Sequence, residues 1–215
     1  KTVGDPIYLQ ETEKAYLKQG AQWSESIHGT NSAGTAAVEE RAIAVVGSDH
    51  YLQSHHNIYC VGSPIFDSSG KLKGVLNMSG HVDQYDPSFL RIVAIVARKI
   101  ENELLMEERE GDTIISLQSE RNLNFEALIA LDKDGCITSM NRAAKEILPI
   151  NEHPEEITIQ FPELFSNYET LLDQLTSQPT FQIINVKSKS FNENFIATLV
   201  RNKTTKQTYF QKKGS

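Results

Sequence analysis

Two apolar runs separated by a polar tetrapeptide decide the fold of the first half of the chain: Ile58-Tyr59-Cys60-Val61-Gly62-Ser63-Pro64-Ile65-Phe66, Asp67-Ser68-Ser69-Gly70 and Leu72-Lys73-Gly74-Val75-Leu76-Asn77-Met78. The outer runs predict strands because they are apolar and rich in β-branched residues. The polar tetrapeptide ends in glycine and predicts a turn, so the strands form an antiparallel hairpin. Pro64 has no amide donor and should lie at a sheet edge or bulge.

The segments on either side of the hairpin predict further elements of the same domain. The apolar run 42–46 ends at Gly47 and predicts a buried strand. Before it, Thr30 and Asn31 are candidate N-caps for a short helix of small residues. A mixed segment over 7–20 predicts another short helix. After the hairpin, Asp86 and Pro87 open a long helix.

The long helix is expected to continue into a helical connector over residues 106–124. Its apolar stripe has helical spacing and comprises Leu90, Val93, Ala97, Ile100 and Leu104. We expect this stripe to pair with its copy in a homodimer; the alternative is that it packs only on its own domain. Gly111 interrupts the helix before Ile114, Ile115 and Leu117 resume an apolar face, and it is a candidate hinge.

The remaining residues, 125–215, predict a second domain. A strand over 127–131, a turn over 132–135 and a strand over 136–140 lead into a short helix that Asn141 can cap. A helix over 168–175 and strands over 181–186 and 195–200 complete the pattern. Strands, helices and strands in this order predict an antiparallel sheet with helices on one face, so the fold class is α+β.

Composition limits the function classes. The 215 residues suffice for two compact domains, and 39% hydrophobic with 23% charged residues is ordinary for a soluble protein. The net charge of −7 argues against a stand-alone DNA-binding domain. The basic residues over 201–215 are interpreted as a solvated end. No apolar run matches a bilayer span and no secretory signal is visible. Cys60 and Cys136 show no C-x-x-C spacing, which favours the reducing cytoplasm.

Residues 20–80 resemble the GAF domain of the acetoin-operon activators, a family of bacterial sigma-54-dependent regulators. The matching stretches are Gly20-Ala21-Gln22-Trp23-Ser24-Glu25, Gly29-Thr30-Asn31-Ser32-Ala33-Gly34-Thr35-Ala36, Gly47-Ser48-Asp49-His50-Tyr51, and Cys60 to Gly80. Four linked motifs are far more specific than one. The resemblance implies a GAF domain over 1–105 that lacks its first strand. Ile129 to Gly135 and Met140 to Ala144 resemble the opening of a PAS domain, which implies a PAS domain over 125–215.

The resemblance also implies a pocket for a small molecule between the GAF sheet and the segments that cover it. The implied ligand-binding residues are Trp23, Thr30, Asn31, Thr35, His50, Tyr51 and Cys60. The aromatic faces and convergent hydrogen-bonding groups of this set suit a small polar metabolite. The alternative is that Trp23 is core and Asn31 only caps its helix. Asp49 stands where the family often has Glu, and Asn77 where it often has Asp.

In function, the resemblance implies a sensor that passes a ligand signal to an ATPase and DNA-binding output acting on sigma-54 RNA polymerase. No G-x-x-x-x-G-K-[ST] motif occurs in the chain, so that output would be absent here. The alternatives are the sensor region of a histidine kinase, a dimerisation module without a ligand, and a GAF-fold methionine sulfoxide reductase. The last requires clustered cysteines, and Cys60 is far from Cys136 in sequence.

No metal, cofactor or catalytic role is expected. His50, His55, His56, Cys60 and His81 offer ligand atoms for zinc or iron, but the first four occupy one polar stretch without helical pairing. Nothing lowers the pKa of a thiol at Cys60, which argues against redox sensing. In the implied PAS domain, His153 is the one candidate for a haem ligand. Acid pairs such as Glu107-Glu108 are interpreted as solvated faces, and no triad is visible, so the chain is not expected to be an enzyme.

Overall fold

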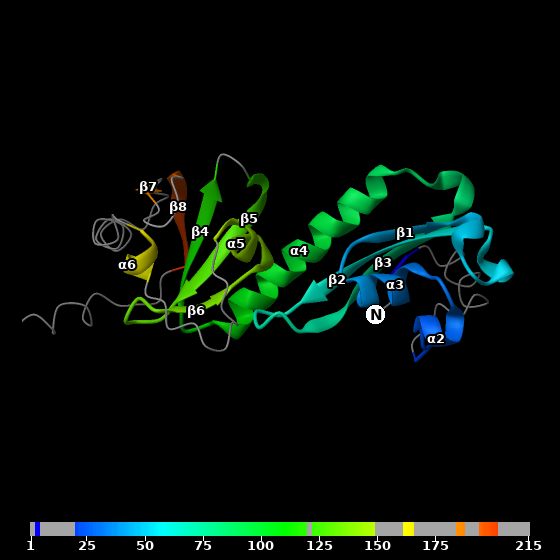
Figure 1. Ribbon diagram of the computed structural model, residues 1–215, viewed down its shortest axis with the longest axis horizontal. Helices are drawn as coiled ribbons and strands as arrows, with labels where there is room; N and C mark the ends of the chain where they lie inside the picture. Colours follow the sequence, from blue (N-terminus) through cyan, green and yellow to red (C-terminus); the bar gives the residue numbers. More distant parts are fainter. Residues whose placement is uncertain are drawn as a thin grey trace, which may run out of the picture. The chain divides into compact units, whose positions relative to one another are not determined.

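The computed structural model describes residues 3–4, 20–119, 122–148, 161–165, 184–187 and 194–201 (Figure 1). Two compact units divide the chain. Unit 1 comprises Lys1–Ile65 and Leu72–Ala97, and unit 2 comprises Phe66–Lys71 and Arg98–Ser215. The helices predicted over 7–20 and 168–175, the basic end and His153 lie outside the described residues. None of the described helices combines the length and apolarity needed to span a membrane.

Unit 1 contains a three-stranded sheet in the order β1-β2-β3. Its strands are β1 (Ile43–Val46), β2 (Ile58–Phe66) and β3 (Leu72–His81). The predicted strand–turn–strand segment is confirmed, with β2 and β3 as neighbours in the sheet. β1 pairs antiparallel with residues 59–62 of β2. Pro64 therefore lies beyond the part of β2 that pairs with β1, where the missing amide removes no bond to that strand.

Unit 1 also contains five short helices in the part of the chain that the structure describes. They are α2 (Glu25–His28), α3 (Ser32–Glu39) and the 3₁₀ helices η1 (Gly47–Asp49), η2 (Gln53–His55) and η3 (Val82–Gln84). α3 contacts β1 and β3, and Asn31 caps it by accepting from the Gly34 amide. A Cβ at Gly62 would lie 2.6 Å from the carbonyl oxygen of Ser32. Only glycine therefore lets the start of α3 approach the β2 backbone this closely.

The helix α4 (Ser88–Glu108) contributes residues to both units. Asp86 accepts from the Ser88 amide at 2.7 Å, as expected for the residue that opens the helix. In unit 1, Val93 packs with Tyr59 and Val61 in a hydrophobic cluster, and Ala97 is fully buried. The stripe predicted to form a dimer interface thus packs in part on its own chain. The prediction that the stripe forms a dimer interface is corrected to this extent. Apolar residues at helical spacing can pack against a sheet as well as against a second helix.

Unit 2 contains a five-stranded antiparallel sheet in the order β6-β5-β4-β8-β7. Its strands are β4 (Thr113–Ser119), β5 (Asn122–Leu131), β6 (Ile137–Met140), β7 (Ile184–Lys187) and β8 (Asn194–Arg201). The helices α5 (Arg142–Ile147) and α6 (Phe161–Leu164) belong to the same unit, and α5 contacts β5 and β6. Asn141 caps α5 as predicted, by accepting from the Ala144 amide.

The prediction of a helical connector over 106–124 is wrong for most of its length. α4 ends at Glu108, and residues 113–119 form β4, which pairs with β5 on one side and β8 on the other. Ile115 and Leu117 are part of the large hydrophobic core cluster of unit 2, while Ile114 packs with Leu105 in a second, smaller cluster. A central strand buried on both faces lacks apolar–polar alternation, so its apolar pattern fits a helix equally well.

The central position of β4 predicts that its inward side chains are essential for stability. Ile115→Ala should lower the free energy of unfolding by about 2–5 kcal/mol, because Ile115 is fully buried and its truncation leaves a cavity. Gln118→Ala, at an exposed position of the same strand, should change stability by less than about 0.5 kcal/mol. Urea unfolding of both variants measures the difference. Equal effects would contradict the placement of β4.

Candidate functional site

Four aromatic rings form a row in unit 1, which we call the aromatic row: His28, Trp23, His55 and His50. Trp23 stacks on His28 with ring centroids 5.0 Å apart and on His55 at 5.6 Å. His55 meets His50 edge to face at 5.8 Å. The rings come from α2, the segment before it, η2 and the end of η1. The row brings together two predicted site residues, Trp23 and His50, with two that were not predicted.

His50 is the most unusual residue of the row. It is 2% exposed, and its Nδ1 lies 3.0 Å from the carbonyl oxygen of Gly47. A carbonyl can only accept, so Nδ1 carries the proton and donates. Burial lowers the pKa of His50 below its ordinary value of 6.5, which favours the neutral ring at pH 7. Nε2 is then a lone-pair acceptor, and it is buried with no hydrogen-bond partner among the described residues.

The polar residues near Trp23 have structural partners. The Asn31 side chain is 1% exposed and uses its amide nitrogen to donate to the carbonyl oxygens of Trp23 at 3.1 Å and Gly29 at 2.9 Å. Thr35 donates from Oγ1 to Glu25 Oε1 at 2.5 Å. Asn31 therefore fixes the backbone at Trp23, and Thr35 ties α3 to α2. Both side chains shape the surroundings of the aromatic row.

Thr30 and Tyr51 lie at the surface. Thr30 is exposed, and its carbonyl oxygen accepts from the Tyr51 amide at 3.2 Å. The Tyr51 side chain is 73% exposed, while its ring lies so close to Gly29 that a Cβ there would stand 2.3 Å from it. Gly29 also has a φ of +63°, which side-chain-bearing residues rarely adopt. These two predicted site residues are thus not buried with His50.

Cys60 ends a chain of polar groups on β2 and β3. Ser32 donates to Asn77 Oδ1 at 2.6 Å, Asn77 Nδ2 donates to Ser79 at 2.8 Å, and the Ser79 hydroxyl donates to Cys60 Sγ at 3.2 Å. Burial raises the pKa of the Cys60 thiol, more than its hydroxyl neighbours lower it. The protonated thiol is a poor nucleophile, which agrees with the expectation that Cys60 is not a reactive cysteine.

The two positions that depart from the family pattern both have defined roles. Asn77 belongs to the polar chain just described, where its side-chain nitrogen donates to the Ser79 hydroxyl. An aspartate at this position has no such donor. Asp49 accepts from the Val46 amide at 3.3 Å and so closes the short turn of η1 that presents His50.

Sequence reasoning missed His28 and His55 as neighbours of Trp23. The sequence suggested His55 only as a metal ligand, and within the described residues no three His, Cys, Asp or Glu side chains are arranged to hold a metal ion. Their stacking could not be predicted because His28 of α2 and His55 of η2 lie far apart in the sequence. The sequence gives only a weak indication that Ser32 and Ser79 form hydrogen bonds in the interior: each is a polar residue beside small or apolar residues.

Residues 6–104 match the family model of the GAF domain, so the chain contains a GAF domain. Its relatives include the signal-transduction and transcriptional-control protein of Clostridium beijerinckii, 25% identical over 89% of this chain and 31% of that protein. The acetoin catabolism regulatory protein of Cupriavidus necator is 33% identical over 62% of this chain and 21% of that protein. A crystal structure of the E. coli DhaR(N)–DhaL complex aligns with a TM-score of 0.49 and 19% identity, over 93% of this chain and 74% of that chain.

The printed names of these relatives are those of regulatory proteins, which supports a regulatory, signal-sensing role for the chain. The chain spans 21% to 31% of the length of the two curated relatives. The resemblance to the acetoin-operon activators is thus confirmed at the level of the GAF domain and of its regulatory homologues.

The environment of His50 predicts a pH dependence of stability. Because the folded-state pKa lies below 6.5, the unfolded chain binds the proton more readily, and stability falls as pH falls through 6.5. His50→Asn removes this titration while its amide can still donate to the Gly47 carbonyl. The unfolding free energies of wild type and variant, measured by denaturant titration, should differ by a constant above about pH 7.5. Below about pH 6.5 the wild type should lose more. Parallel profiles would contradict the buried neutral ring.

Proposed function

We propose that this chain is the signal-sensing region of a bacterial sigma-54-dependent transcription activator, with a small-molecule effector bound by the GAF domain. The GAF match and the regulatory relatives support this proposal. The signal would pass to an ATPase and a DNA-binding module outside these residues, which would contact sigma-54 RNA polymerase and DNA. A ligand acts in such a regulator only through different affinities for two conformations.

The unpartnered Nε2 of His50 carries the argument for a ligand class. A buried acceptor without a partner is costly, and in native proteins such groups often mark a functional site. The neutral ring carries no net charge to hold an ionic group, and its lone pair can accept a hydrogen bond from a hydroxyl. The stacked rings of Trp23 and His55 lie beside His50 and give it an aromatic environment that suits the carbon skeleton of a small molecule. These features favour an uncharged molecule with a hydroxyl group, such as a hydroxy-ketone or diol.

Within this proposal the seven site residues take different roles. Trp23 and His50 contact the ligand, while Asn31 and Thr35 hold the backbone and α2 in place for them. Thr30 and Tyr51, at the surface, border the entrance. Cys60 closes the side formed by β2 and β3, with its thiol already engaged by Ser79.

Thermal unfolding against a panel of small alcohols tests the proposal. Acetoin, 2,3-butanediol and glycerol are compared with acetate and methylamine as charged controls. A ligand at 100 times its dissociation constant should stabilise the chain by about 2.7 kcal/mol, a shift of several degrees. The absence of a shift with every uncharged alcohol, or an equal shift with the charged controls, would overturn the proposal.

Two variants of His50 separate a ligand contact from a structural role. His50→Asn keeps a donor for the Gly47 carbonyl but has no atom at the Nε2 position, so it should weaken binding at least about 10-fold with little loss of stability. His50→Gln places an acceptor near the Nε2 position and loses the hydrogen bond to the Gly47 carbonyl. It should therefore bind the ligand more tightly than His50→Asn and be less stable. The reverse order of affinities would show that Nε2 does not contact the ligand.

We also propose that unit 2 contains a PAS domain, with β4 as an additional strand of its sheet. The order β5, turn, β6, α5 with Asn141 as the cap supports this assignment. Its core combines aliphatic side chains with three phenylalanines, and the Phe165 ring centroid lies 4.7 Å from that of Phe161 and 5.8 Å from that of Phe195. A core packed in this way favours a relay role over the binding of a cofactor.

The homodimer we propose uses a different face of α4 from the predicted stripe. Ile92, Ile95 and Val96 are exposed by 49%, 47% and 42%, and their i, i+3, i+4 spacing places them on one side of the helix. Exposed apolar side chains that form a patch are typical of protein interfaces. Two copies of α4 joined along this face would bury all six side chains.

The dimer proposal predicts a clear effect of charge on this face. Ile95→Glu should raise the dimer dissociation constant at least about 10-fold, because a carboxylate would be buried at the interface. Lys133→Glu, at an exposed position of the turn between β5 and β6, serves as the charge control. Sedimentation equilibrium gives both constants. A monomeric wild type, or equal weakening by both variants, would contradict this interface.

A further inference from the structure

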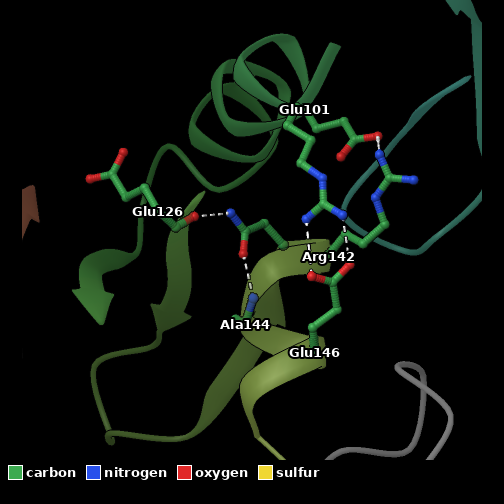
Figure 2. A network of polar contacts seen from close by, with 7 residues as sticks. Glu101, Glu126, Arg142, Ala144 and Glu146 are labelled. Carbon is green, nitrogen blue, oxygen red and sulfur yellow. Dashed lines mark hydrogen bonds and ion pairs between the residues drawn. The ribbon is translucent and has the colours of Figure 1, made fainter. Parts of the chain in front are cut away.

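Glu101 on α4 is a buried carboxylate that serves two donors with the same oxygen. Its Oε1 accepts from the backbone amide of Phe66 at 3.0 Å and from Nη2 of Arg142 at 3.0 Å. The residue is 5% exposed, and Figure 2 shows Arg142 of α5 directed toward it. One oxygen atom thus joins the last residue of β2 to the first residue of α5. Glu101, Phe66 and Arg142 all belong to unit 2.

The burial of Glu101 makes this arrangement sensitive to loss of either partner. Burial raises the pKa of Glu101, and the positive charge of Arg142 opposes that rise. The Arg142 guanidinium also lies over the Phe66 ring, 5.0 Å from its centroid. A buried carboxylate that loses its charge partner is strongly destabilised and turns toward water or takes up a proton. The Phe66 amide then loses its acceptor.

A second carboxylate of α4 holds the same turn. Glu108 Oε2 accepts from the amide of Ser68 at 3.2 Å and from its hydroxyl at 2.5 Å, and Ser139 of β6 donates to the Ser68 carbonyl at 3.3 Å. Glu108 is exposed, as the sequence predicts, and its carboxylate also binds the turn. The turn between β2 and β3 is therefore bound through its backbone to α4 and to the sheet of unit 2.

Two further contacts set α4 against α5 independently of the turn. Arg98 forms two bonds with Glu146, at 2.6 and 3.2 Å, and Asn102 Oδ1 accepts from the Asn141 side chain at 2.7 Å. Figure 2 shows the Glu146 contact beside Arg142. These pairs fix the contact of the two helices, whereas the Glu101 contact alone also includes the Phe66 amide.

We propose that Glu101 is a positioning residue that couples the position of α5 to the backbone at the end of β2. Arg142 keeps the Glu101 carboxylate charged and in place, and the carboxylate in turn holds the Phe66 amide. Arg142 Nε is buried without a hydrogen-bond partner among the described residues, so the present arrangement leaves a donor unmatched. A displacement of α5 that moved Arg142 would release the turn, and release of the turn would free Arg142 by the reciprocity of coupling. The coupling does not depend on the proposed ligand.

Hydrogen exchange of single backbone amides tests the coupling in the chain without ligand. Arg142→Met should make the Phe66 amide exchange about 10-fold faster, because a bond to a charged acceptor is lost although Phe66 and Glu101 are unaltered. Amides of β4 should keep their rates. Arg142→Lys retains the charge, so the Phe66 rate should stay within about threefold of wild type.

Glu146→Gln is the matched control, because it removes a charged pair between α4 and α5 that has no bond to the turn. The proposal requires an unchanged Phe66 rate in this variant. Unchanged exchange in Arg142→Met, or an equal increase in Glu146→Gln, would overturn it. If Arg142→Met does not fold, Glu101→Gln decides: its neutral oxygen is a weaker acceptor, so Phe66 exchange must rise several-fold, and an unchanged rate would overturn the proposal.

Discussion

The structure depends on one constraint: every polar group that leaves water must find a partner inside the protein. Asn31 and Asn141 meet this constraint in the two units. Each is nearly fully buried, caps a helix through its carbonyl oxygen and donates to backbone carbonyls of other segments through its nitrogen. Asn141 also accepts from the Leu128 amide of β5. One side chain thus fixes where a helix begins and which strand or loop lies beside it.

The exceptions to this constraint point to function. His50 Nε2 and Arg142 Nε are buried without hydrogen-bond partners among the described residues, and each belongs to a site for which we propose a function. At His50 the missing partner suits a hydroxyl of an incoming molecule. At Arg142 the unmatched donor belongs to a charge pair that joins a helix to a strand end.

The sequence predicted local structure well and long-range contacts poorly. The β2–β3 segment, the opening of α4 and both asparagine caps follow from residues that are close in sequence, such as the Asp67 to Gly70 turn. β4 could not be recognised from the sequence because a strand buried on both faces lacks the alternation of apolar and polar residues. Of the candidate site, Trp23 and His50 could be named, but not their row with His28 and His55, because stacking depends on loop paths that no local pattern encodes. Glu101 was missed because it opens a charged run, and charge alone does not show that a side chain is buried.

The polar chain that ends at Cys60 has an evolutionary consequence. Asn77 donates to Ser79, so the Ser79 proton is directed at the sulfur. With aspartate at position 77, both Ser32 and Ser79 would donate to the carboxylate, and the sulfur would lose its donor. Asparagine and aspartate codons differ by a single base. One nucleotide change can therefore reverse the hydrogen bond between residues 77 and 79 and remove the donor from the Cys60 sulfur.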